Sequence, residues 1–300
     1  MLAWAELSHA GRRRALWDNR GPPSAPDVAM NPALKPSRSL LAAAADAIRE
    51  FDLIRDGDRI LVGVSGGKDS LSLLHVLLYL QQRAPVRFTI GAANIDPQMP
   101  GYDPSPLAGY AESLGVSYHQ ASYSLARAAK GSFEGRTLCA FCSRMRRGKL
   151  YGLAREHGYN TLALAHHLDD VAETFLMNAF FGGKLRAMPA VYTNDDGDLR
   201  VIRPLVYARE RQTAAFADSA PLPVIPDNCP TCDSATRQRQ QMKALLGELE
   251  AQHPRLYSVL RTTLAPLLRA DATGGLPMPD AAQVLADLRL REPAAVPAAD

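Results

Sequence analysis

The chain has 300 residues, of which 47% are hydrophobic and 22% charged, and its formal net charge is +3 at pH 7. These values exclude a disordered or collagen-like chain and are typical of one large or two modest globular domains. No run approaches the roughly 20 apolar residues of a membrane span, and no apolar signal segment follows the arginines at 12–14. We therefore expect a cytoplasmic protein without a membrane partner, in which local basic patches hold any nucleic acid.

Short β-rich runs alternate with helical segments through most of the chain. After a poorly ordered extension over residues 1–36, Ser39 is the expected N-cap of a first helix that reaches Phe51. Strands are then predicted at 59–64, 86–95, 116–118 and 161–165, and helices at 70–82, 105–114, 143–157 and 168–181. Such alternation indicates an α/β fold, a doubly wound, mainly parallel sheet covered on both faces.

The remaining segments complete a division into four parts. A turn at 195–198 separates two short extended runs, and residues 236–269 are expected to form basic helices. We predict a main domain over 37–225 that carries a first CxxC pair, and a helical region over 226–271 that carries a second. Residues 272–300 form an Ala/Pro-rich tail.

A glycine-rich loop links the first predicted strand to its helix. Gly66 and Gly67 allow a ligand to approach the backbone, and the amides at the start of the helix favour an anion. The loop matches neither the GxxxxGK[ST] phosphate loop nor the GxGxxG dinucleotide motif. Side chains add donors, so the sequence predicts a phosphate site that includes Ser65, Lys68 and Ser70.

All four cysteines fall in two CxxC pairs, Cys139 with Cys142 and Cys229 with Cys232. This arrangement favours a reducing compartment and metal or redox chemistry over structural disulfides. The first pair precedes a basic helix, whose amino-terminal end and positive charges favour thiolates. Thiolates alone do not distinguish an iron–sulfur cluster, a structural zinc ion and a redox dithiol, so all three interpretations stay open.

Two further features carry candidate functional residues. The polar run from Ala165 to Asp170 follows a predicted strand, where open α/β sheets bind ligands, although helix capping is a plainer interpretation. Two basic stretches are candidate contacts for an RNA backbone, against the alternative of a solvated charged face. Their basic residues are Arg144, Arg146, Arg147, Lys149, Arg237 and Arg239.

The loop sequence SGGKDS resembles the PP-loop of the ATP pyrophosphatase superfamily. With further motifs in matching order, the chain is similar to the tRNA-cytidine 2-sulfurtransferase (2-thiocytidine synthetase) family from about Arg38 to about Arg269. These motifs are Leu138–Gly148 around the first CxxC pair, Ala165–Asp170, Gly182–Lys184 with Met188–Pro189, and Ile202–Leu205.

The resemblance implies a PP-loop fold that binds ATP and releases pyrophosphate as it adenylates O2 of an anticodon-loop cytidine, at position 32 of the tRNA. It implies catalytic roles for Lys68, Asp69 and Asp170, with Asp69 also a ligand of Mg²⁺. The implied ATP-binding residues are Ser65, Gly66, Gly67, Lys68, Asp69, Ser70, Asn94, Asp96, Ala165 and His166.

The resemblance also implies a [4Fe-4S] cluster that supplies the sulfur. Its ligands would be Cys139, Cys142 and Cys232, the last chosen because Asp233–Ser234 and a Gln-Arg-Gln helix follow it, with Cys229 as the alternative. The implied partners are tRNA and a cysteine desulfurase or other sulfur donor, and a homodimer stays open. A lysidine-synthetase-like ligase would share the loop but leave the cysteine pairs unexplained. A zinc-stabilised RNA-binding module without catalysis would not need the intact loop.

Overall fold

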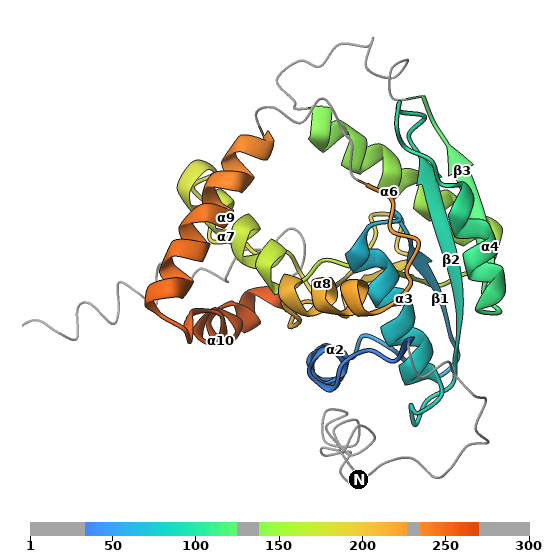
Figure 1. Ribbon diagram of the computed structural model, residues 1–300, viewed down its shortest axis with the longest axis horizontal. Coiled ribbons are helices and arrows are strands. Elements are labelled where there is room, and N and C mark those ends of the chain that lie inside the picture. Colours follow the sequence, from blue (N-terminus) through green and yellow to red (C-terminus); the bar gives the residue numbers. More distant parts are fainter. Residues whose placement is uncertain (1–33, 125–137, 227–234, 270–300) are drawn as a thin grey trace, which may run out of the picture.

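The computed structural model describes residues 34–124, 138–226 and 235–269, and side chains from Phe141 and Gln238 onward in the last two ranges (Figure 1). Most of the predicted extension over 1–36 and the tail over 272–300 lie outside these ranges, as do Cys229 and Cys232. No helix in the described ranges is long and apolar enough to cross a membrane.

A six-stranded sheet with the order β3-β2-β1-β4-β6-β5 forms the centre of the protein. All neighbouring strands run parallel except β5, which is antiparallel to β6. This topology confirms the predicted doubly wound, mainly parallel sheet. The strands are β1 (Asp58–Gly63), β2 (Phe88–Asp96), β3 (Ser117–Ser122), β4 (Thr161–Ala163), β5 (Val191–Thr193) and β6 (Arg200–Ile202).

Helices cover both faces of the sheet. Successive residues of a strand point to opposite faces, so Ile60 and Val62 pack in the large core with α2, α3 and α8, whereas Leu61 packs against α6. All three strand residues are fully buried. The helices are α2 (Arg38–Phe51), α3 (Lys68–Gln81), α4 (Ser105–Ser113), α6 (Leu138–Glu156), α7 (Leu168–Phe181), α8 (Glu210–Ser219), α9 (Ala235–Gln252) and α10 (Leu256–Leu268).

A small helical layer flanks the sheet domain. Leu168 and Ala172 of α7, Leu246 of α9 and Tyr257 of α10 bury one another in a separate apolar cluster. Figure 1 shows these three helices together on the side of the molecule away from β3. Because α7 also begins at the carboxyl end of β4, this layer is attached directly to the ligand-binding edge of the sheet.

The structure differs from the predicted elements at several points. The helix expected at 143–157 begins at Leu138, so the first CxxC pair lies within its first turns, and the strand expected at 116–118 continues to Ser122. The first helix begins at Arg38, and Ser37 rather than Ser39 caps it, because the Ser37 Oγ accepts a hydrogen bond from the Leu40 amide at 3.3 Å. The helix α8 was not predicted. The helices expected over 236–269 are α9 and α10, which are separated at Pro254 because the residue before a proline is disfavoured from helical geometry.

Candidate active site at the carboxyl edge of the sheet

Two loops meet where β1 and β4 lie side by side at the centre of the sheet. The glycine-rich loop leads from β1 into α3, and the residues from Leu164 to His167 lead from β4 into α7. From β1 the chain continues to β2, toward one edge of the sheet, and from β4 it continues to β5 and β6, toward the other edge. Such a reversal of strand order creates the crevice where open α/β sheets bind ligands. The fold thus brings together the two polar motifs that are 100 residues apart in the sequence.

Gly66 has the conformation that the glycine-rich loop requires. Its φ is +83°, and a Cβ atom there would lie 2.4 Å from Cδ1 of Ile225, which also donates its amide hydrogen to the Gly66 carbonyl at 2.9 Å. Ser70 braces the loop from within, since its Oγ donates to the Gly67 carbonyl at 2.9 Å and accepts from the Ser65 amide at 3.2 Å. Gly67 is the N-cap of α3 and contributes no side-chain cap, so the first amides of this helix are available to an anion.

Lys68 is held by two carboxylates from different helices. Its Nζ donates to Asp69 Oδ2 at 3.0 Å and to Glu210 Oε1, on α8, at 3.1 Å. Burial lowers the pKa of Lys68, but the two carboxylates outweigh this effect and raise it. Burial likewise opposes ionisation of Glu210, yet hydrogen bonds from Lys243 and Lys68 lower its pKa to about 2. Lys68 therefore stays protonated, and its ammonium group is held at the start of α3.

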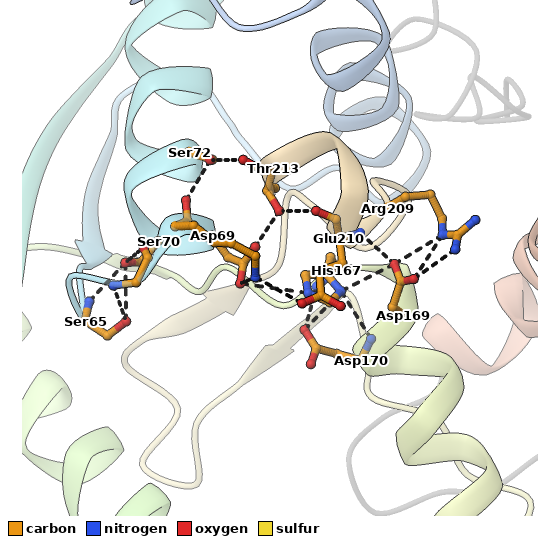
Figure 2. Close-up of polar contacts among 12 residues, drawn as sticks. Ser65, Asp69, Ser70, Ser72, His167, Asp169, Asp170, Arg209, Glu210 and Thr213 are labelled. Carbon is orange, nitrogen blue, oxygen red and sulfur yellow. Dashed lines mark hydrogen bonds and ion pairs between the residues drawn. The ribbon is translucent and has the colours of Figure 1, made fainter. Parts of the chain in front are cut away.

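Figure 2 shows Asp69, Glu210 and His167 converging from α3, α8 and the start of α7. Thr213 Oγ1 donates to Asp69 Oδ1 and also to the Glu210 carbonyl at 2.8 Å. The Nε2 of His167 lies 3.9 Å from Asp69 Oδ2. These contacts join the glycine-rich loop to the His-Asp motif through α8.

The capping interpretation of the His-Asp motif is correct for part of it. His167 caps α7, since its Nδ1 accepts from the Asp170 amide at 3.3 Å and its own amide donates to Asp170 Oδ2 at 3.0 Å. Asp169 accepts from Arg209, which also forms a paired hydrogen bond with Glu250 of α9 at 2.7 and 2.8 Å. The motif thus fixes α7, α8 and α9 relative to one another.

His166 is oriented by a buried arginine. Arg203, only 5% exposed, donates from Nε to His166 Nδ1 at 3.3 Å and from Nη1 to the Pro189 carbonyl at 2.6 Å. Burial, and next the charge of Arg203, hold the pKa of His166 well below its ordinary value. The imidazole is therefore neutral, and because Nδ1 accepts, Nε2 carries its proton.

Asn94 and Asp96 lie at the end of β2, and Asn94 supports the glycine-rich loop. The Asn94 Nδ2 donates to the Val64 carbonyl at 2.7 Å and to the Tyr102 hydroxyl at 2.6 Å, and Tyr102 donates to the Ser65 carbonyl at 3.0 Å. The Asn94 Oδ1 is buried without a hydrogen-bond partner. Asp96 accepts from the Gln98 amide at 2.7 Å. The contacts of Asn94 and Tyr102 attach the end of β2 to the glycine-rich loop.

Cys142 lies on α6 and packs in the apolar cluster that includes Tyr123. Its Sγ is 2.9 Å from the Tyr123 hydroxyl, and burial raises the pKa of Tyr123, followed by its hydrogen bond with Cys142. The charge of Arg146 acts in the opposite direction on the pKa values of Tyr123 and Tyr102. The charge of Arg146 therefore acts on both tyrosines, of which Tyr102 bonds to the glycine-rich loop and Tyr123 to the thiol. The side chain of Cys139, like Cys229 and Cys232, lies outside the described residues.

The basic residues predicted to contact RNA occupy different environments. Arg144, Arg147 and Lys149 are exposed on α6, whereas Arg146 is half-buried and its Nε is buried without a hydrogen-bond partner. Arg239 of α9 pairs with Asp170 at 3.2 Å and with Glu173 at 3.3 Å. The side chain of Arg237 lies outside the described residues.

Several residues of the crevice were not singled out from the sequence. They are Glu173, Arg209, Glu210 and Thr213, which form ion pairs or hydrogen bonds there, whereas Arg203 is part of the Ile202–Leu205 motif but had no assigned role. The charged residues Arg209–Arg211 could have been predicted to belong to the site, because they follow a short extended run at the point where a parallel strand would end. Because α8 was not predicted, these charged residues were not assigned to the site.

The strand order and the glycine-rich loop with Lys68 at a helix start define a PP-loop protein. In agreement, the PP-loop domain family matches residues 38–245. A tRNA-cytidine(32) 2-sulfurtransferase of Anaeromyxobacter sp. (strain Fw109-5) is 44% identical over 239 residues, which cover 78% of each chain. A tRNA-cytidine(32) 2-sulfurtransferase of Geobacter sulfurreducens is 46% identical over 215 residues, which cover 71% of this chain and 83% of the relative. The chain belongs to the tRNA-cytidine(32) 2-sulfurtransferase family.

A solved structure shares the fold. The U34-tRNA thiolase NcsA from Methanococcus maripaludis, determined with its [4Fe-4S] cluster, superimposes with a TM-score of 0.60 at 22% sequence identity. The match covers 83% of this chain and 87% of that one. The two proteins therefore share a fold over most of this chain.

Proposed function

We propose that this protein is an ATP-dependent tRNA sulfurtransferase, which thiolates the cytidine at position 32 of the anticodon loop. Membership of the family supports this function. The observation that carries it is that a phosphate-binding loop and a free thiol each bond to a tyrosine, Ser65 to Tyr102 and Cys142 to Tyr123, and that the charge of one arginine, Arg146, lowers the pKa of both tyrosines. A phosphate loop alone would suit many ligases, whereas sulfur transfer needs both groups.

The residues at the start of α3 fit ATP. The uncapped amides of this helix and the ammonium of Lys68 suit the β- and γ-phosphates, and Gly66 keeps the loop free of side-chain atoms. When the cytidine O2 attacks the α-phosphate, negative charge moves onto the departing pyrophosphate. Lys68 and the loop amides would stabilise this charge electrostatically. The neutral His166, with its proton on Nε2, would serve as a hydrogen-bond donor beside the adenosine or the reacting base.

Asp69 and Asp170 are the proposed carboxylates for Mg²⁺. Their oxygens are the ligand type that Mg²⁺ prefers, and both now accept hydrogen bonds or ion pairs that a cation would replace. Lys68 would turn from Asp69 toward the phosphates as the nucleotide binds. The charge of the site would then remain balanced.

The described part of the cysteine site fits a thiolate-bound cluster. Cys142 is a free thiol near Arg146, and the Tyr123 hydroxyl is placed to donate a hydrogen bond to its thiolate. Ile225, just before the second CxxC pair, bonds to Gly66, and Arg239, just after it, pairs with Asp170. Both ends of that segment are thus attached to the crevice. A [4Fe-4S] cluster on Cys139, Cys142 and Cys232, with Cys229 as the alternative ligand, would supply the sulfur that replaces the activated oxygen.

The macromolecular partners follow from this chemistry. Arg144, Arg147 and Lys149 are exposed on α6 and would contact tRNA phosphates together with Arg146 and Arg237, whereas Arg239 lies at the crevice beside Asp170. An anticodon loop already exposes its bases, which lowers the cost of bringing the cytidine to the site. A cysteine desulfurase or another donor would renew the sulfur. The protein would act in the cytoplasm, as a homodimer or a monomer.

Anaerobic assays of the full chain test the proposal. With ATP, Mg²⁺, sulfide and a tRNA transcript, we expect tRNA-dependent AMP and pyrophosphate, and 2-thiocytidine in the digested tRNA by mass spectrometry. Lys68→Met should lower the rate by about 100-fold or more, because a charge-stabilising donor is lost. The matched control is Lys35→Met, which should retain full activity because Lys35 is an exposed residue just before α2. Binding of tRNA without any nucleotide turnover would contradict the proposal.

A further inference from the structure

The carboxyl end of α7 carries an exposed apolar surface outside the crevice. Phe180 is 59% exposed, Phe181 52% and Leu185 60%. They account for three of the five large hydrophobic residues that are exposed in the described ranges. We call residues 180–186, which comprise the last two residues of α7 and the loop that follows them, the α7 loop. Clustered exposed aromatic residues are costly in water and mark interaction sites, so this surface calls for a partner.

The α7 loop is held in one conformation. The Asn178 carbonyl accepts the amides of Gly182 and Lys184, both at 3.0 Å, and its Nδ2 donates to the Arg186 carbonyl at 2.8 Å. A Cβ at Gly182 would lie 2.9 Å from the Asn178 carbonyl oxygen, and Gly183 has a φ of +59°. The two glycines and Asn178 therefore fix the loop, and a preorganised surface loses little entropy when it binds.

The charge of this segment selects the kind of partner. No acidic residue occurs between Glu173 and Asp195, whereas Lys184 and Arg186 lie within the loop. Lys184 is exposed beside Leu185. Exposed aromatic rings next to cations, without acids, are the combination that binds unpaired nucleotides, through base stacking and phosphate contacts. An apolar protein surface would not require the lysine.

The position of the loop agrees with the same partner. α7 begins at the crevice with His167 and Asp170, and its 14 residues extend about 20 Å before the α7 loop. Figure 1 shows α7 and α9 packed together along this path. The loop therefore lies on the same helix as the reaction site but away from the reacting base, where nucleotides next to the target would pass.

We propose that Phe180 and Phe181 form a stacking platform for unpaired bases of the tRNA anticodon arm, and that Lys184 contacts an adjacent phosphate. This inference rests on the proposed function, and it assigns substrate binding to residues that lie outside the crevice. Stacking tolerates every base, so the platform would add affinity and orientation without selecting a sequence.

Fluorescence anisotropy with a labelled synthetic anticodon stem-loop that contains cytidine 32 tests the proposal on the full chain. Phe180→Leu and Phe181→Leu keep the surface apolar but remove the ring, and each should weaken binding about 10-fold. Phe181→Tyr keeps the ring and should bind within about twofold of wild type. Lys184→Ala should reduce the slope of log affinity against log salt by about 0.7–0.9. Val259→Ala, at another exposed apolar residue, is the matched control and should change nothing.

The outcomes separate this inference from the function on which it depends. If wild type binds and thiolates tRNA but both leucine variants bind as tightly, the platform is wrong and the function stands. If wild type neither binds nor thiolates tRNA, both are wrong. A Phe180→Ala, Phe181→Ala double variant whose sedimentation shifts from dimer to monomer, with unchanged RNA affinity, would assign the surface to a second copy of the chain and overturn the proposal. Binding of ATP should be equal in all variants.

Discussion

The Nε of Arg203 donates a hydrogen bond to Nδ1 of His166 across 3.3 Å. This contact joins two motifs of the sequence, the end of β6 and the polar run after β4, that no periodicity connects. Arg203 has no carboxylate partner among the described residues and instead bonds to His166 and the Pro189 carbonyl. A buried cation of this kind holds its neighbour neutral and fixes which ring nitrogen is protonated.

Replacement of Arg203 should raise the pKa of His166 and remove the hydrogen bond that selects its tautomer. Arg203→Gln removes a positive charge that disfavours the imidazolium ion, so the pKa of His166 should rise toward 6.5 while burial keeps it lower. Long-range proton–nitrogen NMR spectra, assigned with His166→Gln, report both the pKa and the tautomer. We expect a mixture of tautomers in the variant and only the Nε2-protonated form in wild type. Arg200→Gln, on the same strand but bonded to Asp58, is the control and should leave His166 unchanged.

Glu210→Gln should strengthen ATP binding. The carboxylate of Glu210 is 3.1 Å from Lys68 Nζ and competes with phosphate for it, so its removal frees the ammonium and reduces charge repulsion. If loss of the Lys68–Glu210 ion pair makes the binding free energy of ATP more favourable by about 1 kcal/mol, binding is about fivefold tighter, as measured by titration calorimetry. Glu250→Gln removes a carboxylate from Arg209 and not from Lys68, and should leave the affinity unchanged. Weaker binding by the Glu210 variant would show that its carboxylate takes part in holding the nucleotide or its cation.

The sequence predicted the sheet and the glycine-rich loop because both are encoded locally. Ile60–Val64 is a short, mostly apolar run between Arg59 and Ser65, and Gly66 follows Ser65, so the strand and turn signals are adjacent in the sequence. The ion pairs of Glu210 and Arg209 could not be predicted in this way. They depend on α8, whose helix has only Thr213 and Phe216 buried and thus a weak apolar pattern, and on contacts between residues more than 30 positions apart.

Gly66→Ala should destabilise the protein, because it combines two separate penalties. An alanine at a φ of +83° is strained, and its Cβ would overlap Ile225. We expect a loss of about 2–4 kcal/mol in the free energy of unfolding, measured by urea denaturation. Gly67→Ala is the matched control, since a Cβ there meets only Ser65 Oγ at 3.4 Å, and it should cost less than about 1 kcal/mol. Equal losses in the two variants would contradict the role assigned to Ile225.

Glu173 should make stability depend on pH. Burial is the main cause that raises its pKa from 4.5 to about 7, so the folded state binds a proton more tightly than the unfolded state. A raised carboxyl pKa means that folding loses stability as pH rises from about 4.5 to 7, and the loss is complete above 7. Glu173→Gln removes this titration and should gain about 1–3 kcal/mol relative to wild type between pH 4.5 and pH 8. A difference between the two proteins that stays constant with pH would contradict the raised pKa.

Removal of single cysteines should identify the bound metal and its ligands. Under the proposed function, anaerobically purified wild type should hold about four irons per chain, and Cys139→Ala, Cys142→Ala and Cys232→Ala should each lose them. Cys229→Ala is the matched control, because it lies in the same segment as Cys232 and should retain iron. Tyr123→Phe removes the hydroxyl 2.9 Å from the Cys142 sulfur and should keep the iron but lower the reduction potential, since that hydrogen bond favours the reduced cluster. One zinc ion held by all four cysteines would instead support a structural site and remove the sulfur source from the mechanism.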